Sequence, residues 1–123
     1  METTRTAKIF VDEFNILHVK ILGGVIIDKE DAADNFLVAR HLTGGKRFLK
    51  LVDSRKNYRI KKDARLFVER QNNSDIHIAK AILVGTLISK YLMEFFISPE
   101  SPKFPQKIFT SEKKAIEWLK TFR

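Results

Sequence analysis

Cysteine is absent from this sequence of 123 residues, and proline and glycine are scarce, with three and five copies. Without thiols the chain has no disulfides, no thiolate metal site and no cysteine nucleophile. No apolar run approaches the roughly 20 residues that a membrane-spanning helix needs. Residues 1–5 lead into a strand-like pattern and not into the apolar centre of a signal peptide, so we expect a cytoplasmic protein.

What is present suits a packed globular protein. Apolar residues make up 44% of the chain and charged residues 31%, a balance typical of neither disordered nor membrane-spanning proteins. The ten phenylalanines supply most of the bulky core side chains. This length matches one domain, which we expect to cover residues 1–123.

The formal net charge of +8 is the strongest compositional bias. Such a positive field favours nucleic acid, anionic lipid or an acidic protein face as partners. It can equally do no more than keep a small protein soluble. The basic residues are not gathered into one long tail, so composition alone does not choose between these interpretations.

Hydrophobic periodicity divides the chain into alternating strands and helices. Alternation or short apolar runs predict strands at 7–11, 16–22, 47–52, 77–84 and 107–109. A short extended piece is predicted at 25–27 and a polar loop at 53–59. Helices are predicted after Asp28, over 62–71, up to about residue 96, and after Ser111. Gly44 and Gly45 are expected to end the first helix. The order is β-β-α-β-α-β-α-β-α, which predicts an α/β fold with an antiparallel opening hairpin, a mostly parallel sheet and covering helices.

Three strings resemble segments of a known family. They are the strand and polar pair at 48–54, the strand-to-helix step at 81–85, and the terminal strand, acidic helix start and Ala-x-x-Trp-Leu helix at 108–119. With the element order, they resemble the STAS superfamily, the fold of bacterial anti-sigma-factor antagonists. The similarity is greatest to its SpoIIAA-like bacterial branch, which is related in fold to lipid-binding CRAL-TRIO domains.

The resemblance implies a non-enzymatic regulatory or ligand-binding module, whose partner is a protein or a small anionic or lipid-like molecule. Antagonist members of the superfamily carry a phosphorylated serine in an Asp-Ser-Ser-Gly segment where the second helix begins. The corresponding residues here, 60–64, include no serine or threonine, and Ser54 lies several residues earlier. Asp63 either supplies a permanent negative charge there or complements the helix dipole.

The most suggestive segment follows the strand at 47–52, at the edge where open α/β sheets place ligands. It combines many basic residues with one tyrosine, and the helix start behind it offers free N–H groups to an anion. We interpret it as a docking loop for an acidic partner or a phosphate-bearing ligand; the alternative is a solvated loop with ordinary surface charge. The candidate residues are Asp53, Ser54, Arg55, Lys56, Asn57, Tyr58, Arg59, Lys61, Lys62 and Asp63.

A second candidate is the helix that ends near residue 96, which carries more apolar surface than one sheet face needs. It either packs against the last helix and the proline-containing loop, or forms a homodimer face or the wall of a hydrophobic pocket. The residues concerned are Tyr91, Leu92, Phe95 and Phe96.

Motifs of catalysis and cofactor binding are missing from the sequence. His18, His41 and His77 have no metal-ligand spacing, and no Gly-x-Ser-x-Gly elbow, P-loop or dinucleotide fingerprint is present. We therefore expect no metal site, cofactor or catalytic residue. Two alternatives stay open: a basic nucleic-acid-binding protein, although no RNA-recognition signature or zinc finger is seen, and an unrecognised hydrolase.

Overall fold

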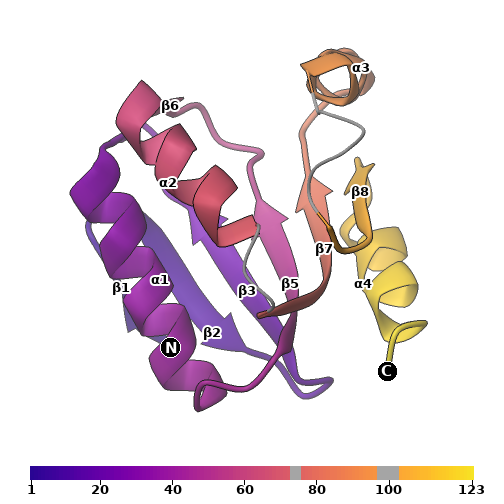
Figure 1. The fold of residues 1–123 in the computed structure, drawn as a ribbon. Coiled ribbons are helices and arrows are strands. Elements are labelled where there is room, and N and C mark those ends of the chain that lie inside the picture. Colours follow the sequence, from indigo (N-terminus) through magenta and orange to yellow (C-terminus); the bar gives the residue numbers. More distant parts are fainter. Residues whose placement is uncertain (73–75, 97–102) are drawn as a thin grey trace.

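A six-stranded sheet with the order β1-β2-β3-β5-β7-β8 forms the middle of the molecule (Figure 1). The computed structural model describes residues 1–72, 76–96 and 103–123. β1, β2 and β3 pair antiparallel, and β3, β5, β7 and β8 pair parallel. The strands are β1 Glu2–Thr3, β2 Ala7–Val11, β3 Ile16–Ile21, β5 Phe48–Asp53, β7 His77–Leu83 and β8 Gln106–Phe109.

Helices cover the two faces of this sheet unequally. They are α1 Lys29–Thr43, α2 Lys62–Asn72, α3 Leu87–Phe96 and α4 Glu112–Lys120. Along β3, successive side chains point to opposite faces. Leu17 packs with Ala39 of α1, whereas Ile16 packs with Ala115 and Leu119 of α4. In Figure 1, α1 and α2 lie together on the near face, and α4 lies beside β7 and β8.

The predicted order of an opening hairpin followed by strand–helix units is confirmed, and most element bounds differ from the prediction by only one or two residues. Three strands of two residues each add to the predicted set: β1, β6 Arg59–Ile60, and β4 Ile26–Ile27, which was predicted only as a short extended piece. β4 and β6 pair parallel as a separate small sheet. Strands this short carry no detectable periodicity, so only their tertiary pairing defines them.

The predicted helix caps are present. Asp28 accepts a hydrogen bond from the Asp31 backbone N–H at 2.9 Å, and Asp31 in turn accepts from the Asp28 N–H at 3.0 Å, which completes a capping box. Gly44 closes α1 in the left-handed conformation, with φ of 64°. Ser111 accepts from the Lys114 N–H at the start of α4.

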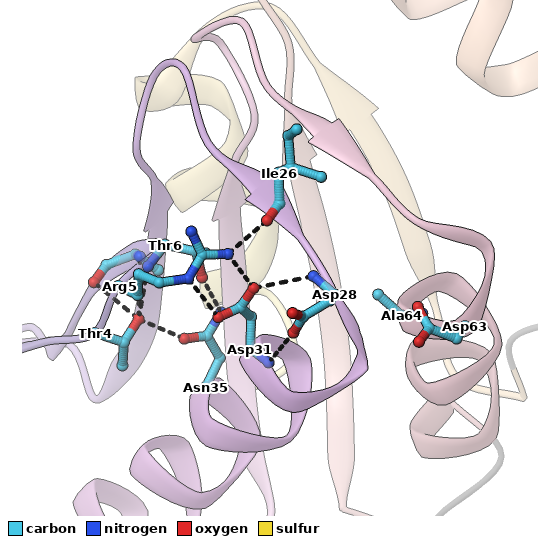
Figure 2. A network of polar contacts seen from close by, with 10 residues as sticks. Thr4, Arg5, Thr6, Ile26, Asp28, Asp31, Asn35, Asp63 and Ala64 are labelled. Atoms are coloured by element: carbon cyan, nitrogen blue, oxygen red, sulfur yellow. Dashed lines mark hydrogen bonds and ion pairs between the residues drawn. The ribbon is translucent and has the colours of Figure 1, made fainter.

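A polar network fastens β4 to the start of α1 (Figure 2). The Arg5 guanidinium donates to both carboxylate oxygens of Asp31 and, from Nη2, to the Ile26 carbonyl at 2.6 Å. Asn35, one turn further along α1, donates to Thr6 Oγ1 at 3.0 Å. Since β4 carries β6 as its ladder partner, these bonds also fix the position of the segment that follows β5.

Candidate partner-binding surface

The segment that follows β5 lies at the carboxyl edge of the parallel strands, as the sequence predicted. Two neighbouring connections reach the same edge. A Cβ at Gly23, after β3, would lie 3.7 Å from Lys56, and one at Gly85, after β7, would lie 3.6 Å from the Arg55 carbonyl oxygen. The topology therefore brings together the connections that follow three adjacent strands.

The segment is not an irregular loop throughout. The Gly24 N–H donates to the Asn57 carbonyl at 2.7 Å, the Arg59 N–H to the Val25 carbonyl at 3.0 Å, and the Lys61 N–H to the Ile27 carbonyl at 2.9 Å. The sequence predicted a polar loop up to Arg59, whereas the structure places Arg59 in β6. A ladder to β4 therefore holds the backbone of the candidate segment.

Ser54 and Tyr58 act mainly inside the fold, and Asp63 is exposed but bonded to the start of α2. Ser54 donates its N–H to the Leu83 carbonyl at 2.8 Å, which continues the β5–β7 ladder. Tyr58 is half-buried against the apolar cluster beneath α1 and α2. Asp63 accepts from the Ala64 N–H at 2.7 Å, in the first turn of α2. These contacts shape the surface and leave other residues to face a partner.

Asp53 and Arg55 neutralise each other. Arg55 Nη2 lies 2.7 Å from Asp53 Oδ2, and Arg55 Nε lies 3.0 Å from Oδ1. Partial burial alone would raise the pKa of Asp53, but the hydrogen bonds from the Arg55 side chain and backbone together hold it below its ordinary value. The same contacts raise the pKa of Arg55. Although Arg55 is exposed, its charge is already compensated.

The other basic side chains of the segment have no such compensation. Within the described residues, Lys56, Arg59, Lys61 and Lys62 are exposed and form no ion pair with a carboxylate. Two partly exposed isoleucines belong to the same small sheet. Ile26, 49% exposed, pairs with Arg59 and shares its face, whereas Ile60, 39% exposed, pairs with the buried Ile27 and projects from the other face. We call these six residues the β4–β6 surface.

A groove of about 460 Å³ runs beside this surface. Its six lining residues come from two segments: Gly24, Val25 and Ile26 on one side and Asn57, Tyr58 and Arg59 on the other. Four of them, Gly24, Ile26, Asn57 and Arg59, are exposed, and the other two are half-buried. The groove is thus part of the outer surface and is not enclosed by the core.

Two polar arrangements escaped the sequence analysis. His18 is buried on β3, and its Nε2 lies 2.7 Å from Asp12 Oδ2 while its ring stacks on Phe10 at a centroid distance of 4.5 Å. Asp12 Oδ1 also accepts from the Ile16 N–H at 3.0 Å. The pair closes the β2–β3 turn. The only sequence signal for this pair was the separation of six residues between Asp12 and His18 across a predicted hairpin.

The second arrangement is a basic cluster within the sheet. Lys80 and His77 on β7 are buried, and Lys50 on β5 is half-buried. The His77 ring lies between Phe48 and Phe104, at centroid distances of 5.0 and 4.6 Å. Burial, and then the charges of both lysines, lower the pKa of His77 to about 2. The sequence signal for this cluster was a single lysine inside each of two apolar runs, residues 48–52 and 78–83.

The structure describes the second predicted candidate, on α3, only in part. Tyr91 is 64% exposed. Leu87 and Ile88, at the start of the helix, are also largely exposed. The side chains of Leu92, Phe95 and Phe96 lie outside the described part of the structure. The interpretation of this helix as a dimer face or pocket wall therefore stays a prediction.

Two further features concern metal binding and membrane spanning. Across residues 1–72, 76–96 and 103–123, no three His, Asp or Glu side chains gather in a way that could hold a metal ion. His41 is exposed in the last turn of α1, whereas the other two histidines are buried. Among the described residues, no helix combines the length and apolar character needed to cross a membrane.

Comparison with known structures identifies the fold. The chain is similar to the crystal structure of an uncharacterised protein of the DUF3478 family, with a SpoIIAA-like fold, from Shewanella loihica PV-4. The TM-score is 0.65 at 14% sequence identity, over 97% of this chain and 98% of that one. The resemblance found in the sequence is thereby confirmed, and the protein has a SpoIIAA-like α/β fold.

The chain belongs to the DUF7793 family, a domain of unknown function, whose family model matches residues 10–123. A second structure, a protein with unknown function from Arthrobacter sp. fb24, shows 23% identity over 91% of this chain and 97% of its own, with a TM-score of 0.31. No curated protein matches the sequence.

Proposed function

We propose that the protein is a non-enzymatic binding module and that its β4–β6 surface contacts an acidic segment of a protein partner. The observation that carries this proposal is the set of four exposed cations without carboxylate partners in the segment that pairs with β4 and its exposed Ile26. Arg55 belongs to the same segment but is paired with Asp53, so its charge is not available to a partner in the same way as the charges of these four residues.

The composition of the surface suits protein recognition. Protein interfaces combine an apolar centre, which loses its water on binding, with a polar rim. Ile26, which shares a face of the small sheet with Arg59, supplies the apolar contact, and the basic residues supply the rim. Rim charges of one sign attract a partner of the opposite sign and increase the association rate more than the affinity. An acidic segment with at least one apolar side chain would match this pattern.

The open form of the groove favours a macromolecule over a small ligand. Pockets for small molecules usually bury most of the ligand surface. A groove with four exposed residues among its six lining residues would leave a small molecule largely in water. A protein partner would instead cover the groove and the flanking cations together.

Charge reversal at two positions tests the proposal. Lys61→Glu/Lys62→Glu inverts the charge of the surface, whereas Lys113→Glu/Lys114→Glu makes the same change on the exposed pair at the start of α4. The full chain and both variants would be used to capture cross-linked partners from nuclease-treated extracts of the source organism. We expect at least one partner bound by the wild type and by the α4 variant but lost from the Lys61/Lys62 variant.

Three outcomes would overturn the proposal. One is that every captured protein binds the Lys61/Lys62 variant as well as it binds the wild type. Another is that binding disappears with nuclease treatment and that gel shifts with nucleic acid weaken steeply with salt, which would favour the nucleic-acid alternative. The third is turnover in a broad ester and phosphatase screen, which would favour a hydrolase.

A further inference from the structure

Lys50 projects from the face of the sheet that carries α1 and α2. Its register partner on β3 is Leu17, which packs with Ala39 of α1, and residues in register on adjacent strands share a face. The Lys50 side chain is half-buried. Within the described residues, its Nζ forms no ion pair and no hydrogen bond. Lys50 is therefore a primary amine held partly inside the protein without a counter-ion.

The neighbours of Lys50 on this face are polar but not acidic. Lys80 on β7 lies opposite Lys50, and Gln106 on β8 lies opposite Lys80, on three strands that run side by side (Figure 1). His77 belongs to the same region, because the charges of both lysines lower its pKa. None of these neighbours can hold a proton on Lys50 by pairing with it as a carboxylate would.

Two of these neighbours carry polar atoms that lack a partner. In the described part of the structure, Gln106 Oε1 and both ring nitrogens of His77 are buried and form no hydrogen bond. Buried polar atoms almost always have a partner. An uncharged imidazole donates from one nitrogen and accepts at the other. These atoms fit a ligand oxygen, and the rings of Phe48 and Phe104 on either side of His77 fit an apolar ligand body.

The surroundings of Lys50 favour its uncharged, nucleophilic form. Burial lowers the pKa of Lys50 to about 8. At pH 7.5 about one Lys50 side chain in four is then uncharged, against about one in a thousand for an ordinary lysine. Only the uncharged amine attacks a carbonyl carbon. Lys80 is the less accessible amine, because it is 6% exposed, and it takes part in a further contact.

We propose that Lys50 Nζ forms a Schiff base with a small aldehyde or ketone that has a compact apolar body. The nitrogen lone pair attacks the carbonyl carbon, and one nitrogen proton moves to the carbonyl oxygen, which gives a carbinolamine. Loss of this hydroxyl group together with the second nitrogen proton releases one water and leaves a C=N bond. The step consumes no oxidant or reductant. The site lies within the large sheet, so its failure would leave the proposal for the β4–β6 surface untouched.

Reductive trapping on the full chain tests the proposal. The protein would be incubated with benzaldehyde at pH 7.5 and treated with cyanoborohydride, which reduces the imine to a stable secondary amine. Peptide mass spectrometry then locates the label. We expect Lys50 to be labelled about tenfold faster than Lys8, which is exposed on β2. Labelling of Lys50 should level off above about pH 9, whereas labelling of Lys8 should continue to rise.

Two variants and a second reagent complete the experiment. A 1,3-diketone condenses with an amine to an ultraviolet-absorbing enaminone without any reductant. We expect this absorbance to be one equivalent lower in Lys50→Met than in the wild type and in Lys8→Met. If Lys50→Met does not fold, the peptide map of the wild type decides alone. Labelling of Lys50 no faster than that of Lys8, or rapid labelling of Lys80 instead, would overturn the proposal.

Discussion

Lys50 and Lys80 occupy directly opposed positions on the neighbouring parallel strands β5 and β7. Residues in register on adjacent parallel strands project from the same face of a sheet, so two basic side chains share one interior region. Burial lowers the pKa of Lys50 to about 8. Burial, reinforced by the charge of Lys50, lowers the pKa of Lys80 to about 7.

These pKa values imply that the protein becomes more stable as the pH rises from about 7 towards 10. In the unfolded chain both lysines keep their protons up to their ordinary pKa of 10.5, whereas in the folded chain they lose them earlier. Stability rises with pH wherever the unfolded state binds more protons. We expect the free energy of unfolding, measured in urea, to rise by about 5 kcal/mol between pH 7 and pH 9.5.

Lys50→Met/Lys80→Met should flatten this pH dependence, because it removes both titrating groups and keeps most of the side-chain volume. Lys8→Met, at an exposed position on β2, is the matched control and should keep the slope. Equal slopes in the wild type and the double variant would show that the two lysines do not titrate as their burial implies.

The Arg5–Asp31 contact gives an acid-dependent contribution to stability. Hydrogen bonds from the Arg5 side chain, more than any other cause, lower the pKa of Asp31 from 3.8 to about 2. Asp31→Asn should lower the free energy of unfolding at pH 7 by about 2 kcal/mol, through loss of a charged hydrogen bond and of half of the capping box. A carboxylate with a lowered pKa stabilises above its unfolded pKa, so the deficit should shrink as the pH falls from about 4 to about 2. Asp34→Asn, on the exposed face of α1, should show little deficit at either pH.

The end of α1 depends on glycine at one position. Gly44 has φ of 64°, a conformation that strains any residue with a Cβ. Gly44→Ala should lower the free energy of unfolding by about 1 kcal/mol. Gly23→Ala places its Cβ at an ordinary 3.7 Å from Lys56 and has no positive φ, so its free energy of unfolding in urea should stay within about 0.5 kcal/mol of the wild-type value. A larger loss at Gly23 than at Gly44 would contradict this account.

The β4–β6 surface contributes little to folding. Lys61 and Lys62 stand at the N-terminal end of α2, where the helix dipole disfavours positive charge. Lys61→Glu/Lys62→Glu should therefore leave the melting temperature unchanged or raise it, by the equivalent of about 0.5 kcal/mol. Circular dichroism melts would check this. A clear loss of stability would mean that these lysines serve the fold, and binding defects of the variant would then not report on a partner surface.

The main strands and helices could be predicted because each carries a local signal. Alternation in β3, the cap at Asp28 and the left-handed stop at Gly44 are short-range effects that a sequence records directly. The position of residues 53–63 at the carboxyl edge followed from the order of elements alone. The basic cluster around Lys80 could not be predicted from the order of elements, because the register between β5 and β7 decides which side chains meet.

The sequence predicted which residues belong to the candidate surface, but not which of them are exposed or how the segment pairs with β4. Asp53, Ser54 and Tyr58 belong to the predicted set, but ion pairing, a ladder bond and burial commit them to the fold. Ile26 was predicted only as part of an extended piece, because its pairing opposite Arg59 joins segments more than thirty positions apart. Such a contact leaves no trace in either segment by itself.

The β4–β6 ladder also limits how this region can vary in length. Surface loops ordinarily tolerate insertions and deletions because their backbones are free of long-range pairing. Here the Gly24–Asn57, Val25–Arg59 and Ile27–Lys61 bonds fix the register along the whole segment. A one-residue insertion between Asn57 and Lys61 would reverse which side chains point outward. Relatives that share this surface should therefore vary in the side chains of the segment and keep its length.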